Sequence, residues 1–417
     1  MAPNTAEMIK VFGRIGLLSF GGPAAQVSLM HQELVEERSW LDEQTFLRAL
    51  SLCMLLPGPE AMQLATYAGW RLRGVFGGLI AGFLFVLPGA LVIAVLVSLY
   101  ANYGALPLVQ SGFLGIKAAV IIIVLHALRN LSRKALKDTE HIGVAALSFL
   151  SIFLLNLPFP LIIVAAAVWG YFWFQSDSQT RTMNKVDAPT GYIRTGLTWV
   201  TLWLAPLILL SLTGQKLLAD LGWFFARLAV VTFGGAYAVL AYMTQTVVDK
   251  YQWISTPQMI DALGLAETTP GPLILVTQFV AMLTGQADGG FPLALAAGAV
   301  ALWATFVPCF LWIFMAAPYL DHLASRPRLS AALNGITAAV VGVILNLSVW
   351  FGLNVLFHNV PQKTWGFFSF PWPDYASANL IALCLVVLAW VLIFKFKFGM
   401  GRTLAMMAAA GIASHFL

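Results

Sequence analysis

An arginine and two helix-breaking motifs recur at a constant spacing along this chain. Arg14 is followed by Phe-Gly-Gly at 20–22 and by Pro-Gly-Pro at 57–59. The same positions return 213 residues later as Arg227, Phe-Gly-Gly at 233–235 and Pro-Gly-Pro at 270–272. A guanidinium offers a planar fork of donors suited to tetrahedral oxyanions. Irregular backbone at membrane depth persists only where it is buried in protein or lines a cavity, so the duplication favours an anion transport site.

The Phe-Gly-Gly motifs are expected to interrupt one helix and begin another. Adjacent glycines permit positive φ and close backbone approach, and Pro23 is preset for a first helical turn. Amide groups exposed at such a break, at the positive end of a helix dipole, bind anions. The alternative is that the glycines only let helices pack closely. The candidate anion-binding residues here are Ser19, Gly21, Gly22, Pro23, Gln26, Thr232, Gly234 and Gly235.

Each Pro-Gly-Pro triplet removes two backbone donors within an apolar segment and is incompatible with a continuous helix. A simple kink or loop between two short helices would satisfy the pattern. The functional interpretation adds that Pro59 and Pro272 open half-helices whose N-termini face the bundle interior, with Gln63 one turn further on. The candidate anion-binding residues here are Pro57, Gly58, Pro59, Gln63, Thr268, Thr269, Pro270 and Gly271.

Three further charges lie within apolar segments, where ionisable groups are costly and usually face partners or water. Lys117 is expected to add positive charge to the anion site. Glu60 and Glu267 are the candidate coupling residues. Burial raises the pKa of a carboxyl group and a nearby arginine or helix N-terminus lowers it, so either residue is a candidate for proton exchange. An ion pair between either carboxylate and Arg14 or Arg227 is the alternative, as is an Arg14 side chain that reaches a lipid headgroup. None of these three charges is duplicated, and neither is Gln26.

Composition indicates the elements that must hold these residues. The 417 residues are 60% hydrophobic and 10% charged, against roughly 25% charged in a soluble domain. Apolar stretches of about 20 residues, enough to cross a hydrocarbon core of about 30 Å, recur with short polar breaks. The pattern predicts an all-α polytopic membrane protein in the lipid bilayer with about thirteen transmembrane segments. They are expected near 9–30, 45–67, 75–100, 112–128, 142–156, 160–176, 196–213, 222–248, 257–281, 291–317, 331–356, 376–395 and 402–417.

Basic loops alternate with loops that nearly lack Lys and Arg, which predicts an N-terminus inside and a C-terminus outside. The second repeat starts seven segments after the first, and an odd number predicts inverted topology. The expected organisation is a first repeat at 1–176, a linker with a connecting helix at 177–221, and a second repeat at 222–417. Pro88 matches Pro308 at a spacing of 220, which indicates seven residues inserted before the second proline.

Several classes of function are disfavoured. The net charge of +5 comes from short basic loops rather than from a nucleic-acid surface. Three cysteines without CxxC or His spacing predict no metal site or disulfide framework, and no cofactor is expected. Six scattered histidines and no nucleophile and base pair argue against an enzyme. The polar start of the chain lacks a signal-peptide pattern, so the first span is expected to be retained. The charged segment 31–43 is expected to be a solvated loop or interfacial helix.

The Phe-Gly-Gly-Pro segment at 20–23, the charged stretch ending in Trp-Leu at 40–41, and Leu-Pro-Gly-Pro at 56–59 resemble the chromate ion transporter family. The second-half segments at 232–237 and 268–272 strengthen the likeness. It covers both halves of the chain and corresponds to the long form of the family, with a duplicated transport domain.

The resemblance implies a carrier of the bacterial cytoplasmic (inner) membrane that exports chromate and confers chromate resistance. Because the chain has no P-loop motif, we expect secondary transport driven by protons or by a counter-anion. Rocking of one half against the other would alternate access to the site. Sulfate would satisfy the same donors, so a sulfate-type transporter remains open, as does an anion channel. A homodimer is compatible with such a carrier, but no residue identifies one.

Overall fold

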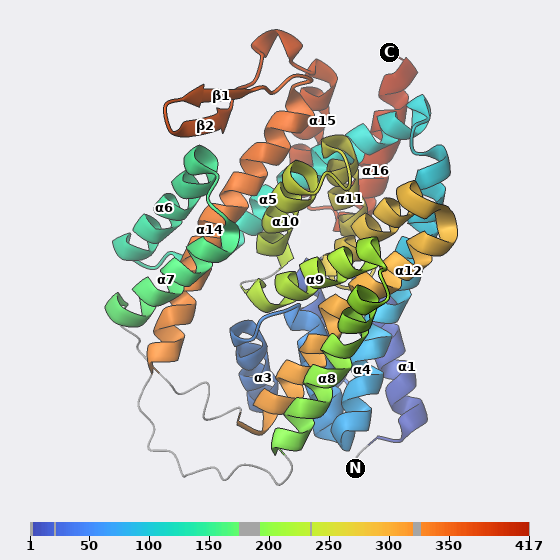
Figure 1. The fold of residues 1–417 in the computed structure, drawn as a ribbon. Helices are drawn as coiled ribbons and strands as arrows, with labels where there is room; N and C mark the ends of the chain where they lie inside the picture. The colour runs from blue at the N-terminus through green and yellow to red at the C-terminus, as the bar shows by residue number, and fades with distance from the viewer. Residues whose placement is uncertain (1–2, 21, 175–191, 234–235, 320–326, 417) are drawn as a thin grey trace. The chain divides into compact units, whose positions relative to one another are not determined.

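The computed structural model describes residues 3–20, 22–174, 192–233, 236–319 and 327–416, almost all of them in helices (Figure 1). The exception is a small antiparallel hairpin of β1 (Gln362–Trp365) and β2 (Phe368–Pro371), with β2 packed against α6. The helices are α1 (Thr5–Leu18), α2 (Gly22–His31), α3 (Glu43–Leu55), α4 (Glu60–Tyr103), α5 (Pro107–Ala135), α6 (Thr139–Leu155), α7 (Phe159–Trp173), α8 (Tyr192–Leu212), α9 (Lys216–Val231), α10 (Ala236–Thr244), α11 (Thr256–Thr268), α12 (Val276–Ala316), α14 (Pro327–Leu356), α15 (Leu380–Trp390) and α16 (Met400–Ala413).

Five helical segments in the described part of the chain are long and apolar enough to cross a membrane. They are α4, α5, α8, the segment Leu273–Tyr319 around α12, and α14 from Arg328 onward. Three shorter apolar helices lie at Thr139–Leu155, Phe159–Trp173 and Leu380–Lys395. The chain is therefore an all-α polytopic membrane protein. The count of thirteen segments stays a prediction.

Helices end at the duplicated motifs, for local reasons that the sequence contains. α1 ends at Leu18 and α2 begins at Gly22, while α9 ends at Val231 and α10 begins at Ala236. α3 ends because Leu56 precedes a proline, which disfavours helical backbone and leaves Leu56 extended at φ −92° and ψ 148°. α4 then starts directly after the first Pro-Gly-Pro, at Glu60.

The long helix after each Pro-Gly-Pro folds back on itself soon after it begins. α4 is interrupted at Gly74, with φ +61°, and α12 at Gly290, with φ +75°. Gly69 and Gly77 would lie about 12 Å apart in a straight helix. Instead, a Cβ on Gly69 would lie 2.2 Å from the Gly77 carbonyl oxygen. The first arm of each long helix is thus a short helix of its own.

The two fold-back points locate part of the predicted insertion. They lie 216 residues apart, which is three more than the spacing of the motifs. A 3-10 turn at Leu273–Leu275 precedes α12, whereas α4 follows its Pro-Gly-Pro directly. This turn therefore accounts for three of the seven residues expected before Pro308.

The helices form two compact units that do not follow the order of the sequence. The first unit comprises Met1–Ser98, Ser176–Val239 and Thr269–Ser330, and the second unit comprises Leu99–Gln175, Leu240–Thr268 and Ala331–Leu417. Each unit takes segments from both predicted repeats. All described residues of the Phe-Gly-Gly and Pro-Gly-Pro motifs belong to the first unit.

In the second unit, α5 packs against α15 and α16 around a core of small and branched side chains. Gly115 makes this contact possible, because a Cβ there would lie only 1.8 Å from the Met407 carbonyl oxygen. α11 packs on α5 as well, with Gly264 facing Ile116. Close helix packing therefore fixes the position of Lys117 on α5.

Candidate anion site

The two Pro-Gly-Pro loops bind the two Phe-Gly-Gly breaks crosswise within the first unit. The Gly58 N–H donates to the Thr232 carbonyl oxygen at 2.8 Å, and the Gly271 N–H donates to the Ser19 carbonyl oxygen at 2.9 Å. Both glycines have positive φ, at +120° and +87°, a region that favours glycine. Each repeat thus holds the break of the other, which the sequence spacing alone did not reveal.

Behind each loop, the first helical turn contains buried amides that lack acceptors. Ala61 and Met62 start α4, and Leu273 and Ile274 start the turn before α12; all four are buried. Within the described part of the chain, their N–H groups form no hydrogen bond. Buried backbone donors are rarely left unpaired, and at a helix N-terminus they suit an anion. These residues were not among the predicted ligands, although every helix start exposes such groups.

The hydroxyl groups at the breaks already donate their protons to their own helices. Ser19, Thr232 and Thr268 donate to carbonyl oxygens three or four residues earlier, at 2.6, 2.5 and 2.8 Å. The sequence predicts that these hydroxyls supply neutral donors to an anion. In this arrangement the protons of these three hydroxyls are already used within the protein.

Two buried carboxamides hold the Pro-Gly-Pro loops. The Gln26 Nε2 donates to the Gly271 carbonyl oxygen at 2.7 Å and lies 3.4 Å from the Ser19 carbonyl oxygen. The Gln63 Nε2 donates to the Pro57 carbonyl oxygen at 2.6 Å. Their position explains why polar side chains occur there in otherwise apolar helices: each stabilises an irregular loop.

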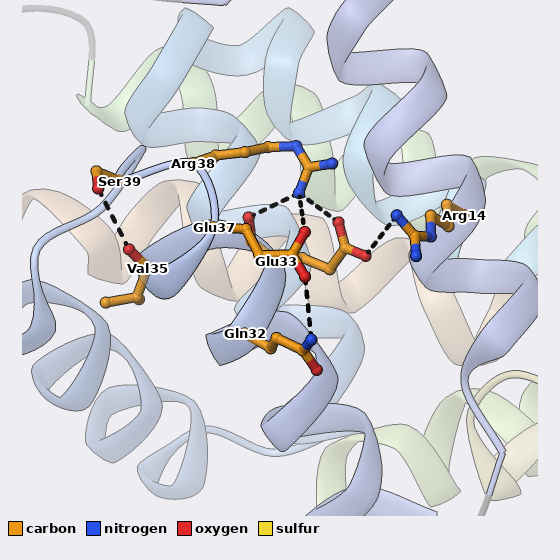
Figure 2. A network of polar contacts seen from close by, with 7 residues as sticks. All are labelled: Arg14, Gln32, Glu33, Val35, Glu37, Arg38 and Ser39. Carbon is orange, nitrogen blue, oxygen red and sulfur yellow. Dashed lines mark hydrogen bonds and ion pairs between the residues drawn. The ribbon is translucent and has the colours of Figure 1, made fainter.

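Arg14 forms an ion pair with a carboxylate from the charged segment 31–43. Figure 2 shows the Glu33 carboxylate between two arginines, 3.3 Å from Arg14 Nη1 and 2.5 Å from Arg38 Nη1. The Glu33 side chain is only 2% exposed, whereas that of Arg14 is 55% exposed. Of the two alternatives expected for this segment, the structure has a helical turn rather than a loop at Gln32–Glu36, and Glu33 is buried on it.

Arg227 differs from its counterpart. It lies on an exposed face of α9, and its Nε donates to the Trp223 carbonyl oxygen at 3.2 Å. Among the described residues, Arg227 forms no ion pair with a carboxylate. Of the two duplicated arginines, therefore, only Arg14 has a carboxylate partner among the described residues.

Lys117 forms an ion pair in the second unit with an acidic residue that the sequence analysis overlooked. Its Nζ lies 2.7 Å from Asp261 Oδ1, and the Tyr100 hydroxyl donates to Asp261 Oδ2 at 2.6 Å. An aspartate inside the apolar span 257–281 was the available signal, because a buried lysine needs a counter-ion.

The candidate coupling residues lie in different units. Glu60 is the first residue of α4 in the first unit and is partly buried, whereas Glu267 is buried near the end of α11 in the second unit. Both have interaction partners, as does buried Thr269. The candidates Gly21, Gly234 and Gly235 lie outside the described residues.

Glu33→Gln is expected to destabilise the protein by about 1–3 kcal/mol, because the buried acceptor of two charged donors loses its charge. The partial exposure of both arginines keeps the loss below that of a fully buried pair. Unfolding in detergent measures it. Glu36→Gln, on the same turn but 61% exposed, is the matched control and should change stability by less than about 0.5 kcal/mol. Equal effects of the two substitutions would contradict the buried network.

His31 should make stability depend on pH. Its hydrogen bond to Glu43, at 2.6 Å, and the charges of Glu43 and Glu36 raise the pKa of His31 above its ordinary value of 6.5. A His whose pKa is higher in the folded than in the unfolded protein stabilises the fold fully below its unfolded-state pKa. This stabilisation is lost as the pH rises through its folded-state pKa. The stability difference between wild type and His31→Gln should therefore shrink above about pH 6.5. A difference that grows with pH would contradict the pairing.

Comparison with known proteins identifies the family. The chromate transporter family matches residues 6–171 and 219–414. A probable chromate transport protein of Synechococcus elongatus is 33% identical over 86% of this chain and 87% of its own length. The chromate transport protein of Cupriavidus metallidurans is 31% identical, with 81% and 80% covered. That of Pseudomonas aeruginosa is 27% identical over 92% of both chains.

No solved structure shows significant similarity to this chain. The family match covers most of the sequence in two stretches, one in each predicted repeat. It includes the duplicated motifs and the arginines before them, so the resemblance drawn from these motifs is confirmed. The chain belongs to the chromate transporter family.

Proposed function

We propose that this protein is a secondary active transporter of chromate, a tetrahedral dianion, in the bacterial cytoplasmic membrane. It would export chromate and so confer resistance, driven by the proton motive force or by exchange with another anion. The family supports a transporter rather than an enzyme. The three chromate transport relatives span four fifths or more of this chain, so the likeness extends over both repeats.

One structural observation carries the site proposal. The buried N–H groups of Ala61 and Met62 and of Leu273 and Ile274 lack acceptors in the described part of the chain. They stand directly behind two Pro-Gly-Pro loops that hydrogen bonds fix to the opposite repeat. Oriented, desolvated amides bind oxyanions without having to reorganise. We assign them to chromate, together with the Phe-Gly-Gly breaks.

In this proposal the charged side chains have two roles, anion binding and proton or cation coupling. Arg14 and Arg227 would contribute guanidinium donors, and Arg14 retains free N–H groups because Glu33 engages only its Nη1. Glu60 and Glu267 would exchange protons or hold a cation during the cycle. Gln26 and Gln63 would keep the loops in register through the hydrogen bonds described above.

The membrane arrangement extends this proposal. We place the N-terminus inside and the C-terminus outside, with two inverted repeats at 1–176 and 222–417 joined through 177–221. Kinks and loops recur at corresponding positions of both repeats, which supports the duplication. The crosswise Gly58 and Gly271 hydrogen bonds would break if the repeats rocked as separate bodies. We therefore infer that the two breaks move together during transport.

The test is uptake of labelled chromate and sulfate into proteoliposomes that contain the purified full chain. We expect saturable chromate uptake that rises above equilibrium when a pH gradient or a counter-anion gradient is imposed. Empty liposomes provide the background. Uptake that reaches equilibrium but cannot be driven uphill would indicate an anion channel, and a preference for sulfate would reassign the substrate. The absence of saturable uptake of either anion would refute the proposal.

A further inference from the structure

A buried charge cluster in the second unit lies outside the motifs. Asp261 is 1% exposed; its Oδ1 forms an ion pair with Lys117 Nζ at 2.7 Å but accepts no hydrogen bond, and its Oδ2 accepts a hydrogen bond from the Tyr100 hydroxyl at 2.6 Å. The three residues come from α11, α5 and the end of α4. The cluster thus ties three helices together through one carboxylate.

Burying this ion pair has a desolvation cost, so stability alone does not explain why the pair is present. The Lys117 side chain is 12% exposed and is followed on α5 by buried Ala118 and Ala119. Asp261 lies in an unbroken run of buried residues from Met259 to Glu267. A well-packed apolar pair is often as stable as a buried ion pair, and intramembrane charges usually mark ion or proton pathways.

The pair exists in one repeat only. The residue that corresponds to Lys117 is Thr337, whose hydroxyl donates to the carbonyl oxygen of Leu333 in its own helix at 2.8 Å. The residue that corresponds to Asp261 is Arg48, which is exposed. A structural requirement of the duplicated scaffold would be expected in both copies. A single copy instead suits a step that occurs once in each cycle.

We propose that Asp261 binds a proton during the transport cycle, in addition to any proton exchange at Glu60 and Glu267, and that its protonation frees Lys117 to bind the transported oxyanion. The inference rests on the proposed function and deepens it. A proton from the aqueous phase adds to Oδ1, the oxygen that faces Lys117, while the lysine keeps its charge. The neutral pair then becomes a site of net charge +1, which attracts an anion; release of the proton restores the ion pair and expels the anion.

This scheme fixes the sign of the linkage. Proton and oxyanion stabilise each other on the protein, and linkage requires the effect to be reciprocal. The two therefore move in the same direction, so the scheme fits export driven by exchange with another anion rather than by the inward proton gradient. Anion affinity should therefore rise as pH falls. The titratable groups that face Asp261 are Tyr100 at the end of α4 and Lys117 on α5. Glu267 lies almost two turns further along α11 and His126 more than two turns beyond Lys117, so neither is a direct partner.

The experiment compares wild type, Asp261→Asn and Asp220→Asn in the same proteoliposomes, with Asp220 as an exposed control carboxylate. The chromate concentration that gives half-maximal uptake is measured from pH 6 to pH 8. Uphill uptake is measured as well, and so is chromate exchange with the same pH on both sides of the membrane. Every variant meets the same chromate speciation at each pH, so differences report on the protein. We expect Asp261→Asn to lose the pH dependence of chromate affinity that wild type shows. Its uphill uptake should fall at least about tenfold, whereas its chromate exchange should fall less than about threefold. Asp220→Asn should match wild type.

Two further variants separate a transport role from a structural one. Asp261→Glu keeps an ionisable group and should retain uphill uptake, whereas Lys117→Gln should lose exchange and uphill uptake together. Wild-type pH dependence and uphill uptake in Asp261→Asn would overturn the inference, as would a parallel loss of exchange and uphill uptake in both Asp261 variants. In either case the proposed function would still be supported if the wild-type protein transports chromate. If wild type moved neither chromate nor sulfate, both would fall.

Discussion

Arg14→Gln is expected to abolish chromate transport in protein that still inserts and folds. The substitution removes a cation beside the first helix break, while Glu33 keeps its 2.5 Å ion pair with Arg38. The buried carboxylate therefore does not become an unpaired charge, and the fold should persist. Loss of one charge-assisted contact of about 1.5–3 kcal/mol corresponds to a fall in affinity of roughly 10–150-fold. Labelled chromate uptake, normalised to inserted protein, measures the effect.

The matched control is Arg71→Gln, an exposed arginine on α4 outside the motifs, which should transport like wild type. Arg227→Gln provides a second comparison. Because Arg227 has no carboxylate partner among the described residues, its charge is fully available and its loss should weaken transport at least as strongly. Wild-type flux in Arg14→Gln protein would show that this arginine serves only the Glu33 network.

Gly22→Ala tests the backbone of the same break and should also abolish transport. Gly22 has φ +79°, and a Cβ there would meet no atom within 4 Å. Any effect would thus come from backbone strain, at about 1–2 kcal/mol for an L-residue in this region. Gly13→Ala has the same open surroundings but lies within α1, so it should be neutral or slightly stabilising. Similar behaviour of the two variants would contradict a strained break.

Gly89→Ala is also expected to have a large effect, and here the cause is steric. A Cβ on Gly89 would lie 2.3 Å from the Pro270 carbonyl oxygen, a backbone atom of the second Pro-Gly-Pro loop. No rotamer change relieves such a contact, so the loop must shift. We expect about 1–3 kcal/mol of destabilisation and loss of transport, because the Gly271 N–H would move away from the Ser19 carbonyl oxygen.

The control for Gly89→Ala is Gly143→Ala on α6, where a Cβ would meet nothing within 4 Å. There the gain in helix propensity of about 0.5–1 kcal/mol is unopposed. Detergent unfolding and chromate uptake should be measured on both variants. Wild-type stability of Gly89→Ala would mean that the loop does not pack as tightly as its geometry indicates.

The crosswise hydrogen bonds change how alternating access must be considered. Because Gly58 binds Thr232 and Gly271 binds Ser19 within one compact unit, the sequence repeats are not independent bodies. The two units instead combine segments from both repeats. Duplication therefore supplied two equivalent loops, and the fold joined them into one backbone framework.

Composition and local sequence are sufficient to predict the membrane class and the residues at which helices end. Hydropathy depends on composition, while proline removes an N–H and glycine permits positive φ; these are local properties. The breaks after Leu18, Leu55 and Val231 follow from them. The interaction partners of the charged side chains, in contrast, depend on tertiary packing. Glu33 with Arg14, and Asp261 with Lys117, are chosen by helix packing across long sequence separations, and the constant spacing of 213 residues contains no information about which side chains meet.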